Sequence, residues 1–554
     1  MIEIDGKQYS VPSDDEMTRR ATKARLVGAA NAVETPDGYV YIIRNSDNDY
    51  SILLPSYIRD LDCSAGDRIC GLLRESDYPR HSSDTILRIE GGTGIIKVDK
   101  MLDYFVLKEL HINMALPKVW TNERMFITIK ADKIVIENLI LPNVLTLHTI
   151  ITRADSIINI SPSIEIKNIV APKAKKVMNL LPAMPIDADV EINNIDIRSA
   201  TDISGMFEHI IMSRLSFDNI HTGDIKTADK LFRSAQIGEL DISKFNTKHI
   251  RSADEMFSEA VIESAVNKEI RLEFNRLSSA NGMFFKCNFG NNVHSVDIDF
   301  NGSKIRNLGA IFKNFKAIKL SVNNIEVYAE STVPFEYIGL DYSFLRCKIS
   351  VLNINNLEVH NAKRLNKTFF DSEIRELHLE NIRLPEITHL NSVFELAKIS
   401  RLQVENVDLH NVYDITRLFY DTQIHDRVAL RDVGITKISE VKGAFERATM
   451  MHLDLSDIII DGYIGGTFDD CNIVTMTILG DTSFKVRDFS RIGIIHNLII
   501  GKQFICNGRP IDDVTNNLNL YDTICNLKLY GVGEVVVKGD NKKNATGSEV
   551  LEDN

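Results

Sequence analysis

The chain has 554 residues, of which 44% are hydrophobic, and a formal net charge of −13 at neutral pH. This acidic balance, without any basic block, argues against nucleic acid as the principal partner. No apolar run reaches the roughly 18 residues of a membrane span.

The compartment follows from the start of the chain and from its cysteines. Residues 1–6 (MIEIDG) have neither the basic nor the apolar region of a signal peptide. The seven cysteines are scattered and form no CxxC pair, which fits a reducing compartment. We therefore predict a cytoplasmic protein without a membrane segment, or a virion component assembled in a cytoplasm.

Residues 1–102 are predicted to form an α+β module. A hairpin is expected over residues 2–11, a helix from the capping box Ser13–Glu16 to about Ala32, and a second hairpin over residues 39–54. This module would cap the first coil of the repeats described next. The alternatives are an attachment module and an enzyme module, although no nucleophile–base or metal signature supports the latter.

A repeat begins near residue 103 and continues to about residue 500. Met206-Phe207, Leu231-Phe232 and Met256-Phe257 recur 25 residues apart. The same apolar template follows Phe369, Phe394 and Phe445, and it follows Phe419 after a one-residue insertion before Val428. Upstream the Phe is lost, but the strand half survives at Leu110, Ile134, Ile164 and Val190. A period of this length indicates a solenoid, here of about 15 units.

Each unit contains two predicted parts. The pattern I-x-x-L-x-Φ alternates between apolar and polar residues, which is typical of a short strand with one buried face. The segment before each Phe resembles a helical turn, with Ser252–Glu255 as a capping box. The sequence therefore predicts an α/β solenoid of strand-plus-short-helix units.

Two residue ladders accompany the strands. The first is an amide ladder expected to bond the backbone of neighbouring coils, and its members are Asn138, Asn168, Asn194, Asn219, Asn324, Asn356, Asn381 and Asn406, with Asp432 and Asp457 in later units. The second places Cys287, Cys347 and Cys471 at a position held elsewhere by alanine. Cysteine there is expected to be a small buried residue.

The motif Φ-F-x-x-C/A, followed by I-x-x-L-x-Φ and a polar turn, resembles the BspA-type leucine-rich repeat. More narrowly, LFRSAQIGELDISKFNTKHI (residues 231–250) is similar to the 25-residue variant with an MFxxC…LDLSNF consensus. The resemblance extends over the whole repeat region, about 400 residues. It implies a curved leucine-rich-repeat superhelix whose strand-lined concave face binds other molecules, in a family found on surface proteins and in some phage-encoded ones.

The outward strand positions of this face form a polar and acidic strip. Its candidate partner-binding residues are Asp218, Asp241, Asp297, Asp299, Asn353, Asn355, Glu380, Glu405 and Asp454. No Trp, Tyr or Arg, the residues that dominate tight interfaces, stands among them. The strip is therefore predicted to be a solvated face, or to bind a basic protein or a carbohydrate along an extended track.

No motif for catalysis, cofactor or metal was found. The loop Gly91–Gly94 lacks the spacing of phosphate-binding loops, and the 14 histidines show no paired metal spacing. We therefore predict a non-enzymatic interaction or scaffold protein that acts through the solenoid (residues 103–500) without a cofactor. The alternative is a phage structural or receptor-binding component that attaches through residues 1–102. Residues 501–539 are predicted to be a C-terminal cap, and residues 540–554 a disordered tail.

Overall fold

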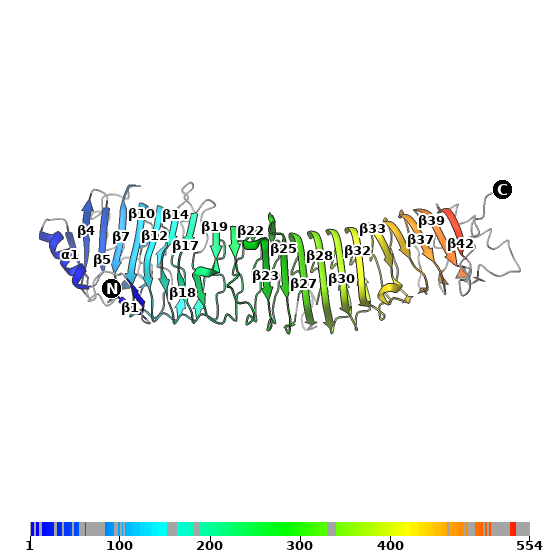
Figure 1. The fold of residues 1–554 in the computed structure, drawn as a ribbon, viewed down its shortest axis with the longest axis horizontal. Coiled ribbons are helices and arrows are strands. Elements are labelled where there is room, and N and C mark those ends of the chain that lie inside the picture. The colour runs from blue at the N-terminus through cyan, green and yellow to red at the C-terminus, as the bar shows by residue number, and fades with distance from the viewer. Residues whose placement is uncertain are drawn as a thin grey trace. The chain divides into compact units, whose positions relative to one another are not determined.

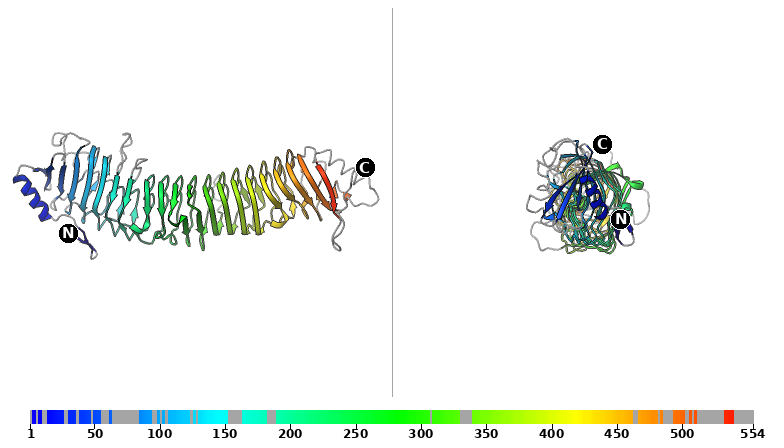
Figure 2. Two further views of the ribbon diagram at one scale, coloured as in Figure 1. Left: turned by 45° about the horizontal axis from the view of Figure 1, so that its top comes forward. Right: turned by 90° about the vertical axis from the view of Figure 1, so that its left-hand side faces the viewer.

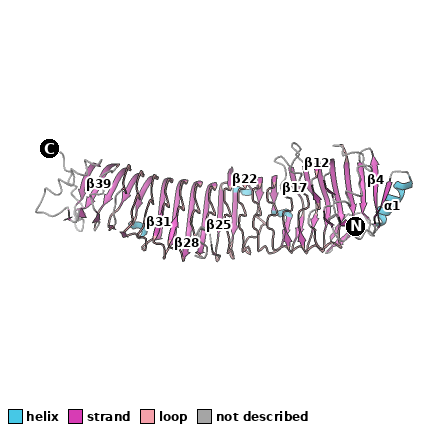
Figure 3. Cartoon of the chain, turned by 180° about the vertical axis from the view of Figure 1, so that it is seen from behind, coloured by secondary structure: helices cyan, strands magenta, loops and turns pink. Residues whose placement is uncertain are grey.

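The computed structural model describes residues 2–4, 7–9, 14–26, 30–35, 38–46, 49–54, 61–62, 84–93, 98–99, 102–103, 106–122, 125–127, 129–151, 163–181, 189–306, 308–329, 339–461, 466–480, 483–484, 493–501, 505–506, 509–510 and 532–538. The chain forms two compact units, Met1–Arg271 and Leu272–Asn554. Strands dominate both of them, as Figure 1 and the colouring by element type in Figure 3 show.

The elements of the first unit are mostly short strands. They are β1 (Ile2–Ile4), β2 (Lys7–Tyr9), α1 (Asp14–Leu26), β3 (Ala30–Thr35), β4 (Gly38–Ser46), β5 (Asp49–Leu54), β6 (Leu61–Asp62), β7 (Ile86–Gly91), β8 (Val98–Asp99), β9 (Leu102–Asp103), β10 (Val106–Ala115), β11 (Phe126–Ile127), β12 (Lys130–Ile140), β13 (Thr146–Leu147), β14 (Ser163–Ile166), β15 (Ile169–Val170), β16 (Lys176–Val177), β17 (Asp189–Ile192), β18 (Ile195–Ile197), β19 (Ile211–Ser216), η2 (Phe217–Asn219), β20 (Ile220–Thr222), β21 (Gln236–Asp241), β22 (Val261–Ala265) and η3 (Val266–Lys268). Strand β23 (Glu269–Glu273) runs across the boundary between the units.

The main sheet of the first unit is mixed. Strands β3, β4 and β5 pair antiparallel, and β5 then pairs in parallel with β7, which pairs in parallel with β10. Along the following coils Leu110 aligns with Ile134, Ile134 with Ile164, and Ile164 with Val190. Strands β1 and β2 also pair antiparallel, so both predicted N-terminal hairpins (β1–β2 and β4–β5) and the upstream strand repeats are confirmed. The predicted helix is shorter than expected, because α1 ends at Leu26 and β3 begins at Ala30.

The second unit repeats one parallel ladder. Its elements are β24 (Asn288–Asn292), β25 (Ser295–Asp299), β26 (Lys304–Ile305), β27 (Lys316–Tyr328), β28 (Lys348–His360), β29 (Arg364–Asn366), β30 (Glu373–Arg383), β31 (His389–Asn391), β32 (Lys398–Asp408), β33 (Gln423–Ala429), η4 (Arg431–Val433), β34 (Lys437–Ile438), β35 (Thr449–Asp454), β36 (Ile459–Ile460), β37 (Asn472–Ile478), β38 (Ser483–Phe484), β39 (Ile494–Gly501), β40 (Ile505–Cys506), β41 (Arg509–Pro510) and β42 (Val532–Lys538). Strands β27, β28, β30, β32, β33, β35, β37, β39 and β42 follow one another in the sheet, each parallel to the next (Figure 2).

The segments before and after each Phe are turns and not the short helices that were predicted. The residues two before and two after each Phe have a left-handed backbone, as at Lys230 (φ 57°) and Ser234 (φ 54°) around Phe232. Their amide groups therefore bond the next coil: Lys230 N donates to Asp254 O (2.8 Å) and Phe232 N to Met256 O (2.8 Å). The predicted superhelix of strand-plus-short-helix units is therefore not observed, and that prediction is wrong. Over the described residues the fold is a β-solenoid of about 14 turns with almost no helix.

The expected capping box at Ser252 has a different role. Ser252 Oγ donates to Asp229 Oδ1 of the preceding coil (2.6 Å), and the amide of Asp254 donates to the same oxygen (2.9 Å). Glu255, which would complete the box, is left-handed (φ 55°) and therefore cannot lie in the first turn of a right-handed helix. The hydroxyl and carboxylate connect two coils and do not begin a helix.

The phenylalanines form a continuous stack within each unit. In the first unit the ring of Phe232 lies 6.0 Å from that of Phe207 and 4.9 Å from that of Phe257. In the second unit successive rings are 5.0–5.7 Å apart from Phe284 to Phe468, in the order Phe284, Phe312, Phe344, Phe369, Phe394, Phe419, Phe445 and Phe468. Because a single coil cannot bury its own ring, the stack explains why the coils must lie on one another.

The amide ladder is confirmed, but its bonds run mainly from side chain to side chain. Asn356 donates to Asn324 (2.9 Å), Asn381 to Asn356 (3.1 Å) and Asn406 to Asn381 (3.0 Å). Asn219 differs, since it donates to the backbone oxygen of Ile192 (2.9 Å). Asn324, Asn356, Asn381 and Asn406 are all left-handed, a conformation that asparagine tolerates better than most residues. The ladder therefore marks a corner of the coil.

At the C-terminal end, β42 pairs in parallel with β39 and so adds a further strand to the ladder. Residues 511–531 of the predicted C-terminal cap lie outside the described residues, as do residues 540–554.

Candidate interaction surfaces and an interior cavity

The predicted strip becomes two rows on the outer face of the second unit. Asp297, Ser321, Asn353, His378 and Gln403 align on neighbouring strands. The next outward row is Asp299, Asn323, Asn355, Glu380 and Glu405. The structure therefore brings Asp297, Asp299, Asn353, Asn355, Glu380 and Glu405 together on successive strands.

The remaining strip residues lie elsewhere. Asp218 is exposed on η2 of the first unit, whereas Asp241 is only 7% exposed at the end of β21. Burial pushes the pKa of Asp241 up, but hydrogen bonds from Ser243 and Ser216 outweigh it and hold the pKa below its usual range. Asp241 thus acts as a structural acceptor. Asp454 lies on β35, beyond β33, and is bonded to Arg427 (2.8 Å).

Part of the outer rows is internally bonded. Asn355 donates to Asn323 (2.9 Å) and Asn353 to Ser321 (3.3 Å). Glu380 accepts a bond from Asn381 (3.4 Å). Glu380 and Glu405 are exposed and stand opposite each other on β30 and β32. Like charges in directly opposite positions are destabilising, so this pair is not there for the stability of the sheet. We refer to Asp297, Asp299, Glu380 and Glu405 as the acidic strip.

A second surface lies on the first unit and was not predicted. Trp120, the sole tryptophan, is 57% exposed, and Leu145 beside it is 46% exposed. The amide of Leu145 donates to Trp120 O (3.0 Å), and the same position continues along the next coils through further backbone bonds. We call this row the tryptophan ridge, and its members are Trp120, Leu145, Lys175, Thr201, Lys226 and Arg251.

The charge of the tryptophan ridge is opposite to that of the whole chain. Lys175, Lys226 and Arg251 are all exposed, whereas the chain carries a net charge of −13. Lys173, also exposed, donates to Asn143 Oδ1 (2.7 Å) on the neighbouring coil. Because Trp and Arg are enriched at interface hot spots, the ridge has the anchor residues that the acidic strip lacks.

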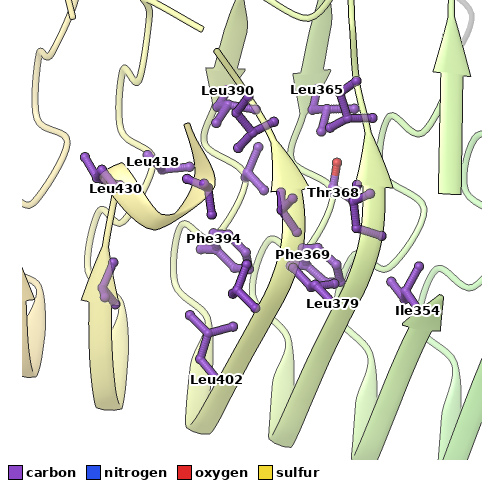
Figure 4. A pocket seen from close by; sticks show the side chains of 18 of the residues that line it. Ile354, Leu365, Thr368, Phe369, Leu379, Leu390, Phe394, Leu402, Leu418 and Leu430 are labelled. Carbon is purple, nitrogen blue, oxygen red and sulfur yellow. The ribbon is translucent and has the colours of Figure 1, made fainter. Parts of the chain in front are cut away.

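The interior of the second unit contains an apolar cavity of about 320 Å³. The rings of Phe344, Phe369, Phe394 and Phe419 line one side of it, and leucine, isoleucine and valine side chains of β28, β30 and β32 line the other. Figure 4 shows Leu379 and Leu402 facing Phe369 and Phe394, with Leu418 and Leu430 at one end.

An opening in the sheet accounts for the cavity. The ladder between β30 and β32 runs from Glu373–Lys398 to Arg383–Asp408, whereas that between β32 and β33 stops after Ile399–Ile424. The one-residue insertion before Val428 shifts the register of β33, which still pairs with β35 over residues 427–429 but no longer pairs with β32. The chain then forms η4, which is followed by the left-handed Gly434 (φ 84°). Leu377 is 0% exposed, but Leu402 at the same register on β32 is only half-buried.

Charged side chains surround this opening. Asp426 Oδ2 accepts a bond from Leu402 N (3.0 Å) in place of a strand partner. Arg427 donates to Asp432 (2.7 Å) and to Asp454 (2.8 Å), and the bond to Asp454 raises the pKa of Arg427. Burial pushes the pKa of Asp454 up, but hydrogen bonds from Ser456 and Arg427 outweigh it, so the pKa lies below its usual range. Two carboxylates thus bond the guanidinium of Arg427, and a third, that of Asp426, accepts from the backbone amides of Leu402 and Arg427.

The described part of the chain contains no group of three or more His, Cys, Asp or Glu side chains that could hold a metal ion. Cys287, Cys347 and Cys471 are buried and unpaired with one another, as expected for a small core residue. Burial raises the pKa of all three thiols, that of Cys471 to about 12. Within the described residues no helix is long and apolar enough to cross a membrane.

The fold defines this protein as a parallel β-solenoid built from repeats of about 25 residues. Residues 182–296 and 338–458 match the family model described as Mycoplasma protein of unknown function, DUF285. The predicted resemblance to a 25-residue repeat family is therefore confirmed for the region 182–458 at the level of a leucine-rich-repeat-like solenoid. No curated protein and no solved structure matches the chain.

Proposed function

We propose that this protein is a non-enzymatic binding protein that recognises an acidic protein partner through the tryptophan ridge. The observation that carries the proposal is the exposure of Trp120 and Leu145 side by side, at 57% and 46%. Scattered exposed apolar residues are ordinary, but a large aromatic adjoining a second apolar side chain and a basic row is typical of a docking site. The charge of Lys175, Lys226 and Arg251 selects an acidic partner.

The partner would bind along the coils. Its apolar residues would cover Trp120 and Leu145, and its carboxylates would face the basic members of the ridge. Because these cations are exposed, they contribute more to the rate of association than to its free energy, and binding should weaken as salt is added.

The experiment is a pull-down with the full chain, compared with a Trp120→Ser/Leu145→Ser variant. The control is Met451→Ser, because Met451 is 48% exposed on the second unit. We expect the double variant to lose the partner and the control to keep it. The emission of the sole tryptophan should shift to shorter wavelength when the partner binds. If the double variant retains the partner, and the tryptophan emission of the wild type does not shift on binding, the ridge is rejected as the docking site.

The acidic strip supports a second candidate surface, for a basic partner. The unfavourable alignment of Glu380 with Glu405 is the observation in its favour. A Glu380→Lys/Glu405→Lys variant should lose such a partner without a loss of thermal stability. If it binds as the wild type does, the strip is a solvated face.

A further inference from the structure

The interior cavity is used by neither proposed surface, and its size is that of a ligand site. Apolar cavities of roughly 150 Å³ stay dry and hold one benzene, and ligand pockets begin at roughly 300 Å³. The cavity here measures about 320 Å³ and is lined almost entirely by apolar side chains. It therefore has room for an apolar ligand.

The cavity is long in the direction in which the coils stack. Its lining begins at Ile325 on β27 and continues across β28, β30 and β32 to Ile435, which follows η4. At roughly 4.8 Å for each step between strands, these coils span about 19 Å. An unbranched alkyl chain such as a dodecyl group fits this length better than a compact ring system does.

The opening between β32 and β33 is the way in. Leu402, Val404 and Val407 line the cavity and are half-buried, although Leu377 and Ile382 at two of the same registers on β30 are buried. The side chains of Asp426, Arg427 and Asp432 line the same opening. A ligand that enters there keeps its polar end beside these groups.

The charge at the opening selects the polar end. Asp426, Asp432 and Asp454 outnumber the single guanidinium of Arg427, which is already bonded to Asp432 and Asp454. Arg401, next to Leu402 on β32, is exposed on the outer face. Because carboxylates outnumber the guanidinium here, an anionic head group would be repelled and a cationic one attracted.

We propose that this cavity binds an amphiphile with a single long alkyl chain and a cationic head group. The chain lies between the phenylalanine stack and β28, β30 and β32. The head group lies at the opening beside Asp426 and Asp432.

The test is dye displacement on the full chain. N-phenyl-1-naphthylamine, an uncharged dye that fluoresces in apolar sites, is titrated first and should bind saturably. Dodecyltrimethylammonium, dodecanol and dodecanoate then compete, each below its micelle concentration. We expect the cation to displace the dye at a concentration about tenfold lower than dodecanoate, because like charges repel the carboxylate.

Two variants assign the site. Val404→Phe fills the opening and should weaken dye binding about tenfold or more, since it occupies the space of the ligand. The matched control is Val351→Phe, because Val351 is also half-buried but lies outside the cavity lining. Asp432→Asn should reduce the preference for the cation over dodecanoate about threefold to fivefold and leave dodecanol unchanged.

Each result decides one part of the proposal. If the dye does not bind saturably, or if a folded Val404→Phe variant binds it as the wild type does, the cavity is not a ligand site. If Val404→Phe does not fold, deletion of Asp426, which should close the opening, replaces it under the same criterion. If dodecanoate competes as well as the cation, the assignment of the head group is wrong.

Discussion

The ladder between β30 and β32 and the ladder between β32 and β33 begin alike and end differently. The first stays paired to Arg383–Asp408, whereas the second ends after Ile399–Ile424. The amide ladder also stops here: Asn406 donates to Asn381, but Asp432 of the next coil bonds Arg427. The phenylalanine stack, in contrast, continues from Phe394 to Phe419 and Phe445 at 5.5 and 5.7 Å.

This difference shows that the two sides of a coil are independent. The insertion before Val428 is absorbed by the strand side, while the turn side keeps its contacts. The side that keeps its contacts is the one with rings to stack and with backbone bonds between coils, as from Phe394 N to Leu418 O (2.9 Å). A solenoid can therefore open its core locally without breaking its stack.

The largest expected effect is the loss of a fully buried phenylalanine ring in the first unit. Phe232 is 0% exposed between Phe207 and Phe257, so Phe232→Ala should lower the free energy of unfolding by about 3–5 kcal/mol. Phe394 is half-buried beside the opening, and Phe394→Ala should cost less, about 2–3 kcal/mol. Denaturant unfolding of both variants measures the difference. Equal losses of free energy of unfolding would mean that Phe394 is packed as tightly as Phe232 despite the opening.

Deletion of Asp426 should remove the difference between the two ladders. The deletion restores the 25-residue spacing, so Val428 would align with Leu402 and the ladder could continue. Each restored backbone bond contributes about 0.5–1.5 kcal/mol, and we expect a net stabilisation of about 2 kcal/mol. Thermal unfolding of the deletion variant gives the sign. A lower melting temperature would indicate that η4 is the preferred structure of this coil.

The amide ladder can be tested at an inner member and at its last asparagine. Asn381 has a neighbour on each side (Asn356 and Asn406), so Asn381→Ala should cost about 1–2 kcal/mol, since alanine also tolerates φ 55° poorly. Asn406→Ala carries similar backbone strain (φ 51°) but removes only one ladder bond, that to Asn381, and should therefore cost less. Asn381→Gly, which relieves the backbone, separates the two contributions. If alanine and glycine cost the same at residue 381, the conformation contributes nothing.

Much of this fold could be predicted from periodicity, because periodicity determines which residues face inward. Leu110, Ile134, Ile164 and Val190 align as their spacing predicts. The turns could not be predicted, because the left-handed backbone at Lys230 depends on bonds to a coil some 25 residues away and not on local preference.

Of the candidate sites, too, some could be predicted from the sequence and others could not. The alignment of Glu380 with Glu405 follows from the repeat, and sequence reasoning placed both on one face. The cavity could not be predicted, although its only sequence signal, the insertion before Val428, was visible. Whether an added residue lengthens a turn or opens a sheet depends on which side of the coil has the stronger contacts. The exposure of Trp120 was missed because upstream coils lack the Phe that marks the repeat.

The smallest expected effect concerns the turn side of a coil, where each Phe is flanked by left-handed residues. Lys230 is exposed and left-handed (φ 57°), and a left-handed conformation costs most residues more than glycine. Lys230→Gly should therefore raise the free energy of unfolding by about 0.5 kcal/mol, after allowance for the greater entropy of glycine in the unfolded chain. Lys244 is exposed with an ordinary backbone, so Lys244→Gly should have the opposite sign. Because the two substitutions are chemically identical, their thermal unfolding isolates the conformation. If both variants lose stability, the left-handed conformation of Lys230 does not cost the folded protein free energy.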